Sequence, residues 1–161
     1  MRVEVLATSI GVTKGSFYAH FANRAELLTE MLEEWERRCT DDVLARVEAA
    51  GGDATARIKN AGTLTFSDDL LPIDLAVRAW SRHDPSVAAR LRRADNARLE
   101  FLREEFRTFL TDPDEIEARS TLAFTLAIGR HFLAADHGAR GRDDAVSLAA
   151  RRLLFLPEHP G

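Results

Sequence analysis

Cysteine is almost absent from this chain of 161 residues, because Cys39 is the only one. A single cysteine excludes an internal disulfide and is typical of a reducing compartment. Long uncharged apolar runs are also missing, which argues against a membrane span. The first residues lack the basic-then-apolar layout of a secretory signal. These absences predict a cytoplasmic protein with no membrane partner.

The residue groupings that catalysis or metal binding require are missing as well. None of the histidines has metal-ligand spacing, and His131 and His137 do not share a helix face. No glycine-rich phosphate loop follows a strand. Cys39 lies on an apolar helical stripe, where a thiol is inert core. We therefore expect no enzyme, no metal and no cofactor.

Strand-like alternation of useful length is absent, as are repeats and low-complexity tracts, so the sequence predicts an all-α fold. Hydrophobic residues make up 45% of the chain and charged residues 30%, which is enough apolar material for a core. Pro, Gly and Asp mark the breaks between helices, with Asp84-Pro85 and Asp112-Pro113 as repeated cap-then-proline starts. The predicted helices cover residues 3–9, 13–20, 24–49, 53–67, 72–82, a long segment from 85, 114–136 and about 143–155.

The predicted helix over 24–49 is continuous and amphipathic, because apolar residues recur along it at gaps of three or four up to Gly51-Gly52. It is long enough to link an N-terminal head to a body. The helix over 114–136 is apolar on almost every side, so it must be covered on every side.

Charge is unevenly distributed along the chain. The net charge is −4, yet residues 1–24 hold Arg2, Lys14 and Arg24 against Glu4 alone. A slightly basic head on an acidic body fits a small DNA-reading head with a separate regulatory body.

Residues 10–24 predict a helix end, a tight turn and a second short helix, which is the layout of a helix-turn-helix. Phe17 and Phe21 supply a buried face, and Thr13 is placed as the N-cap. Gly15 allows close approach to DNA, and Lys14 can contact a phosphate or a guanine edge. A capped helical hairpin with an ordinary surface is the alternative that spacing alone leaves open.

The segment GVTKGSFYAHFANRAELL, residues 11–28, resembles the recognition segment of TetR-family transcriptional regulators nearly residue for residue. The resemblance implies base or groove-wall contacts for Lys14, Ser16 and Ala19. It implies phosphate contacts for Tyr18, His20 and Arg24. With Thr13 and Gly15, these residues are the predicted DNA-binding set.

The family's DNA-binding head has three helices, and this chain starts inside the second. We therefore expect the first helix of the head to be absent. A mis-assigned start, a fragment of a longer chain and a natural variant that has lost strong DNA binding are the open explanations.

The body is expected to enclose a ligand pocket between its helices. Asp95 interrupts an apolar stripe, and either orients a ligand or lies at the edge paired with Arg92 or Arg98. Aromatic residues at helical spacing are otherwise core. The candidate pocket residues are Phe66, Trp80, Asp95, Leu102, Phe106 and Phe124.

The last two helices are expected to form a dimer surface as a four-helix bundle with a symmetry mate. The candidate interface residues are Leu122, Leu126, Gly129, Leu133, Ala149 and Leu153. Such a dimer spaces two reading heads for a palindromic operator in double-stranded DNA.

Together these features predict a partial helix-turn-helix head with its linking helix over residues 1–38, and a helical ligand-binding and dimerisation domain over 39–161. The expected function is a ligand-responsive regulator, a repressor acting as a homodimer on an unknown small-molecule effector. The alternative is a dimeric small-molecule- or partner-binding helical module that has lost strong DNA binding.

Overall fold

The computed structural model describes residues 24–154, and all regular structure among them is helical. The helices are α3 (Arg24–Cys39), α4 (Asp41–Ala50), α5 (Ala54–Thr65), α6 (Leu71–Ser81), α7 (Pro85–Arg107), α8 (Pro113–Gly129) and α9 (Arg142–Leu153). The predicted all-α fold is confirmed. None of these helices is long and apolar enough to cross a membrane.

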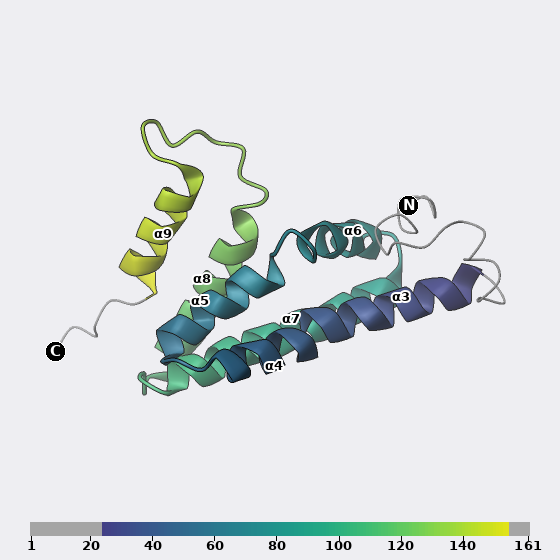
Figure 1. The fold of residues 1–161 in the computed structure, drawn as a ribbon, viewed down its shortest axis with the longest axis horizontal. Coiled ribbons are helices and arrows are strands. Elements are labelled where there is room, and N and C mark those ends of the chain that lie inside the picture. The colour runs from purple at the N-terminus through teal and green to yellow at the C-terminus, as the bar shows by residue number, and fades with distance from the viewer. Residues whose placement is uncertain (1–23, 155–161) are drawn as a thin grey trace.

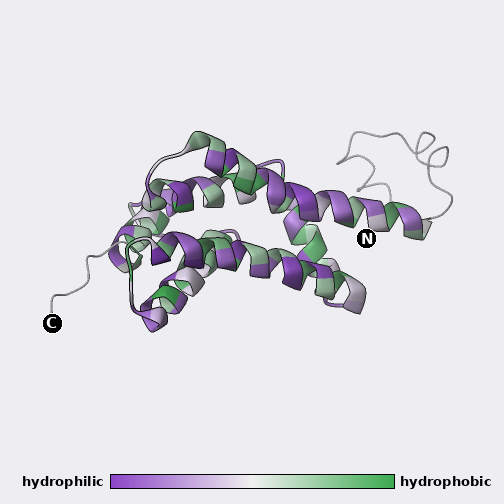
Figure 2. Ribbon diagram, turned by 90° about the horizontal axis from the view of Figure 1, so that it is seen from below, coloured by the Kyte–Doolittle hydropathy of each residue, from purple (hydrophilic) through white to green (hydrophobic). Residues whose placement is uncertain are grey.

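Helix α7 is the central element of the body. It packs against α3, α5, α6 and α8, and α3 runs alongside it over much of its length (Figure 1). Helices α5 and α8 stand at the end of α7 opposite α6, and α9 lies beyond them on the same side. Hydrophilic and hydrophobic residues alternate around the long helices, as expected for amphipathic elements (Figure 2).

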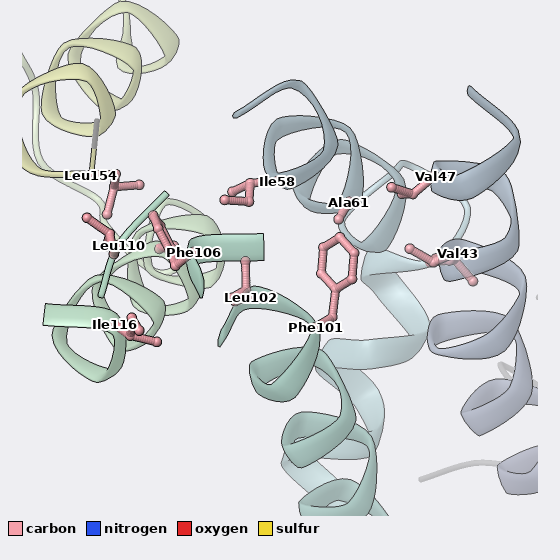
Figure 3. Close-up of a cluster of buried hydrophobic side chains, with 12 residues drawn as sticks. Val43, Val47, Ile58, Ala61, Phe101, Leu102, Phe106, Leu110, Ile116 and Leu154 are labelled. Atoms are coloured by element: carbon pink, nitrogen blue, oxygen red, sulfur yellow. The ribbon is translucent and has the colours of Figure 1, made fainter. Parts of the chain in front are cut away.

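Two apolar clusters form the core. The smaller cluster joins α3, α6 and α7 and is centred on Trp35, Val77 and Val87. The larger cluster joins α4, α5, α7 and α8 (Figure 3) and includes Val47 and Phe106, both fully buried. Both clusters include residues of α7, so a shift of α7 would change the packing of both.

Acidic N-caps begin three of the helices, as the sequence predicts. The Asp53 carboxylate accepts from the Ala56 N–H at 2.8 Å, and Asp84 accepts from the Ser86 N–H at 2.9 Å. Asp112 accepts from the Asp114 N–H at 2.9 Å. These carboxylates satisfy amide groups that have no partner inside the helix.

The single helix predicted over 24–49 is wrong, because it divides at Thr40 into α3 and α4. The apolar stripe continues across the division, with Cys39 and Val43 both buried. The Thr40 hydroxyl donates to the Glu36 carbonyl at 2.6 Å, the same oxygen that the Thr40 N–H uses. Such a bond four residues back often bends a helix. Gly51 and Gly52 end α4 with positive φ, as predicted.

Helix α8 ends at Gly129, seven residues before the predicted end at 136. Phe132 and Leu133 therefore lie in the connection to α9, where both side chains are exposed. The expectation that this segment is covered on every side is wrong for the single chain, because Leu122 on α8 is also exposed. Phe109 lies beyond Arg107, where α7 ends, and its side chain is exposed.

Candidate functional site

A small cavity of about 60 Å³ lies where α4, α5, α7 and α8 meet. Phe101 from α7 points between Ala61 of α5 and Val43 of α4 (Figure 3). Its lining is almost entirely apolar, and the charged member is Arg98. An apolar wall of this kind suits a nonpolar part of a small ligand.

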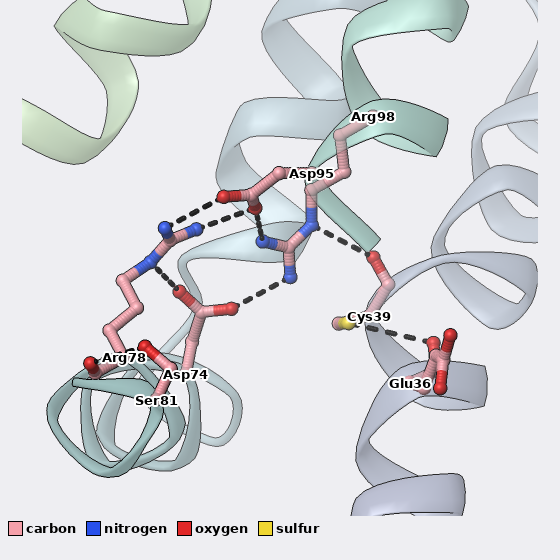
Figure 4. A network of polar contacts seen from close by, with 7 residues as sticks. All are labelled: Glu36, Cys39, Asp74, Arg78, Ser81, Asp95 and Arg98. Carbon is pink, nitrogen blue, oxygen red and sulfur yellow. Dashed lines mark hydrogen bonds and ion pairs between the residues drawn. The ribbon is translucent and has the colours of Figure 1, made fainter. Parts of the chain in front are cut away.

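Arg98 connects the cavity to a buried network of ion pairs (Figure 4). Its Nη2 donates to Asp74 Oδ1 at 2.8 Å, and its Nη1 donates to Asp95 Oδ1 at 3.0 Å. Arg78 contacts the same two carboxylates, with Nε to Asp74 Oδ2 at 2.7 Å and Nη2 to Asp95 Oδ1 at 2.7 Å. Two guanidinium groups therefore balance two carboxylates between α6 and α7.

The charge balance matters because the network is largely removed from water. Asp74 is fully buried, and Arg98 is 7% exposed. Burial opposes the charged form of Arg98 most strongly, but the contributions of Asp74, Cys39 and Asp95 together outweigh it, so the pKa of Arg98 lies above its ordinary value. The network is electrically neutral, so removal of any one member would leave a buried charge without its counterpart.

Arg98 also reaches the end of α3. Its Nε donates to the Cys39 carbonyl oxygen at 3.4 Å, and its guanidinium lies 6.0 Å from the centre of the Trp35 ring. One side chain thus touches the cavity, the ion-pair network and the last turn of α3 (Figure 4). Farther along α3, Arg93 and Arg90 of α7 pair with Glu36 at 2.9 and 3.2 Å.

The Cys39 thiol is not set up as a nucleophile. Burial raises its pKa to about 11, so the thiol is protonated at neutral pH. No group of His, Cys, Asp or Glu residues within 24–154 could hold a metal ion.

The predicted pocket residues fall into two groups. Phe66, Leu102 and Phe124 line the cavity. Phe106 is fully buried in the larger core cluster, and Trp80 packs against the smaller one.

Asp95 also lies away from the cavity wall, and it is held by Arg98, as the edge-paired alternative predicted, and by Arg78. Arg98 lines the cavity but was not among the predicted pocket residues, although its position next to the apolar stripe of α7 is a usable signal.

The predicted dimer residues are spread over α8, the following connection and α9. Leu122 is exposed, whereas Leu126 packs partly against the larger core cluster. Leu133 does not share a helix face with them, because α8 ends at Gly129. Ala149 is half-buried on α9, and the side chain of Leu153 is outside the described part.

The predicted DNA-binding residues precede the described part of the chain. This applies to Thr13, Lys14, Gly15, Ser16, Tyr18, Ala19 and His20. Arg24 is the first residue of α3, but its side chain is also outside the described part. Their roles stay predictions.

The segment that carries those residues leads directly into α3, and α3 is held by an all-helical body with a cavity. This is the layout expected of a helical DNA-binding regulator. Residues 1–31 match the family model of bacterial regulatory proteins, tetR family. No curated protein and no solved structure matches the chain. The match covers residues 1–31 of the 161 residues and supports a TetR-type DNA-binding regulator.

Proposed function

We propose that the protein is a ligand-responsive repressor that binds a palindromic operator as a homodimer and releases it when a small molecule enters the body. Residues 1–38 form the DNA-binding head with its linking helix, and residues 39–161 form the ligand-binding and dimerisation domain. The observation that carries the proposal is the position of Arg98, which lines the cavity and donates to the last turn of α3.

Ion pairs between α7 and α3 support the proposal that a change at the cavity shifts the position of the head. Arg90 pairs with both Glu33 and Glu36 of α3, at 3.2 Å in each case, and Arg93 pairs with Glu36. Because the family match over residues 1–31 extends into α3, a shift of α7 would move the head. A ligand that favours the shifted arrangement lowers DNA affinity by its differential affinity for the two arrangements.

Exposed apolar side chains support a homodimer. Leu122 is 43% exposed, Leu133 47% and Phe132 62%. Exposed large apolar side chains on α8 and in the following connection are residues that another protein can cover. We assign the interface to Leu122, Leu126, Gly129, Leu133, Ala149 and Leu153. A twofold dimer would space two heads for half-sites one helical turn apart or a multiple of it.

Repression is the mode that needs the fewest additional contacts. A dimer that occupies a promoter excludes polymerase without touching it, whereas activation requires a further surface. The alternative function is a dimeric small-molecule- or partner-binding module without DNA binding, and it would keep the cavity and the exposed apolar surface.

DNA binding separates these two functions. The test is fluorescence anisotropy of the full chain with duplex DNA from upstream of its own gene, with a shuffled duplex of equal length and composition as the control. We expect tighter binding to the promoter duplex and a log–log salt slope that Lys14→Ala reduces by up to about 0.9 per lost phosphate contact. Equal, weak binding to both duplexes at every salt concentration would favour the alternative.

A further inference from the structure

A second and larger hollow of about 860 Å³ lies between α5, α8 and α9. These helices lie toward the same end of the molecule, and α9 packs against α8 (Figure 1). We call this hollow the outer cleft and the 60 Å³ cavity the inner cavity. The outer cleft is within the size range of small-molecule sites.

The two hollows adjoin. Five residues line both: Ile58, Gly62, Phe66, Ala123 and Ala127. Three of them are glycine or alanine, so the wall between the hollows is thin. At Gly62 no atom outside its own helix turn lies within 4 Å of the place that a Cβ would occupy, so open space reaches the backbone of α5.

The inner cavity is too small to hold a whole effector. An apolar cavity of roughly 150 Å³ accommodates benzene, and the inner cavity has less than half that volume. It suits a short apolar chain, and the rest of such a molecule would continue past Gly62 and Phe66 into the outer cleft.

The two hollows differ in the charge of the residues that line them. The outer cleft is lined by Lys59, Arg130 and Arg151 against one carboxylate, Asp68, although the whole chain carries a net charge of −4. Within residues 24–154, Arg151 has no ion-pair partner, and Arg130 pairs only with the exposed Asp143. Arginines with exposed or missing counter-charges are suited to bind an anionic group.

His131 adds an unsatisfied polar atom at the same place. Its Nε2 is buried without a hydrogen-bond partner, and its ring lies 5.6 Å from the Phe66 ring, between centres. A buried polar atom without a partner is costly, and a polar group of a ligand would satisfy it. Phe66 and His131 thus mark the point where the apolar wall gives way to polar groups.

We propose that the two hollows form one binding site for an amphipathic anion, a small molecule with an apolar chain and one anionic head group such as a carboxylate. The end of the chain occupies the inner cavity, and the rest of the chain and the head lie in the outer cleft, with the head near Arg130 and Arg151. The assignment names the effector class of the proposed function and rests on it.

Isothermal titration calorimetry of the full chain tests the proposal with three probes of one chain length: octanoate, 1-octanol and octylammonium. We expect octanoate to bind about tenfold more tightly than 1-octanol, the size of one charge-assisted contact. Octylammonium should bind least. Equal affinity for octanoate and 1-octanol, or stronger binding of octylammonium, would overturn the anionic head assignment.

Variants locate the two ends of the ligand. Arg151→Gln should remove most of the preference for octanoate over 1-octanol, whereas Arg152→Gln, an exposed neighbour outside the cleft lining, should preserve it. Gly62→Leu should weaken octanoate and 1-octanol alike, because its side chain enters the connection between the hollows. Gly62→Ala, which fits the open space, is the milder variant if the leucine variant does not fold. Unchanged binding in both Gly62 variants would place the ligand elsewhere.

The readouts keep this inference separate from the proposed function. Octanoate binding that depends on Arg151 but leaves DNA affinity unchanged supports the site and contradicts the ligand-responsive regulator. DNA release by 1-octanol as strong as by octanoate contradicts the anionic head and supports the regulator. Loss of octanoate binding on dimer formation, measured over a protein concentration series, would show that a second copy covers the outer cleft, and would overturn the site.

Discussion

Arg98 and Asp74 form a buried ion pair in which the guanidinium Nη2 lies 2.8 Å from the carboxylate Oδ1. Their side chains are 7% and 1% exposed. The pair joins α6 to α7, and the same guanidinium donates to the Cys39 carbonyl of α3. Three helices therefore meet at one side chain that also lines the inner cavity.

Because Asp74 and Arg98 are paired and buried, the free energy of unfolding should depend on both residues together and not on each one alone. Asp74→Asn leaves a buried cation short of a counter-charge, so we expect a loss of about 3 kcal/mol in the free energy of unfolding. The double variant Asp74→Leu with Arg98→Met removes both charges and should lose less than the single variant. Urea denaturation measures both, with Asp69→Asn, an exposed carboxylate, as the control. A double variant less stable than the single one would contradict this account.

The Asp84 cap predicts a pH dependence of stability. The hydrogen bond from the Ser86 side chain, followed by those from backbone amides, lowers the pKa of Asp84. A group whose pKa is lower in the folded state stabilises the fold above its unfolded pKa. That contribution is lost as the pH falls through the folded value. Asparagine also caps helices but does not titrate.

We therefore expect the fall in Tm between pH 7 and about pH 3 to be smaller in Asp84→Asn than in the wild type, because the unfolded carboxylate titrates near 3.9. Scanning calorimetry at the two pH values measures this difference. Asp69→Asn is the matched control, and an identical fall in all three proteins would contradict the role of Asp84.

Cys39 should be protected from thiol reagents. Burial raises its pKa to about 11, and its side chain is 1% exposed. At pH 8 the thiolate fraction alone should slow reaction by about a hundredfold against an ordinary cysteine. The measurement is the rate of reaction with Ellman's reagent in native protein and in urea. Equal rates would mean that α3 does not stay packed against α6 and α7.

The proposed dimer surface can be tested through the oligomeric state of the protein. Leu122→Asp places a charge on an exposed apolar residue of α8 and should shift the dimer toward monomer. Thr121→Asp, its exposed neighbour, is the control that should remain dimeric. Size-exclusion chromatography with light scattering reports the mass, and a monomeric wild type would remove the dimer from the proposal.

The sequence predicts the helices well where their signals are local. Local sequence is enough to predict that helices start at Asp53, Asp84 and Asp112, because an N-cap side chain bonds to amides only two or three residues later. The bend at Thr40 escapes prediction, because threonine fits a helical pattern and its bond to the Glu36 carbonyl is seen only in three dimensions. The early end of α8 was not predicted because the apolar pattern continues past Gly129 into the exposed connection.

The candidate site was less predictable. Phe66, Leu102 and Phe124 face one cavity, but Phe106 shares their pattern and lies in the core. Apolar periodicity identifies a buried face without saying whether that face is filled. The Arg98–Asp74 pair spans residues 24 apart on two helices, and single-sequence patterns carry no signal at that distance.

The central claim is that occupancy of the inner cavity reaches the DNA-binding head through Arg98. Arg98→Lys keeps the charge beside Asp74 but loses the planar fork that bridges the carboxylates and the Cys39 carbonyl. The most direct test is the promoter-duplex Kd of wild type and Arg98→Lys, each with and without saturating octanoate or 1-octanol, whichever binds more tightly. We predict that ligand weakens wild-type DNA binding by about tenfold or more, and that the lysine variant binds ligand with a much smaller effect on DNA. An unchanged wild-type Kd with ligand bound, or equal responses in the two proteins, would contradict the claim.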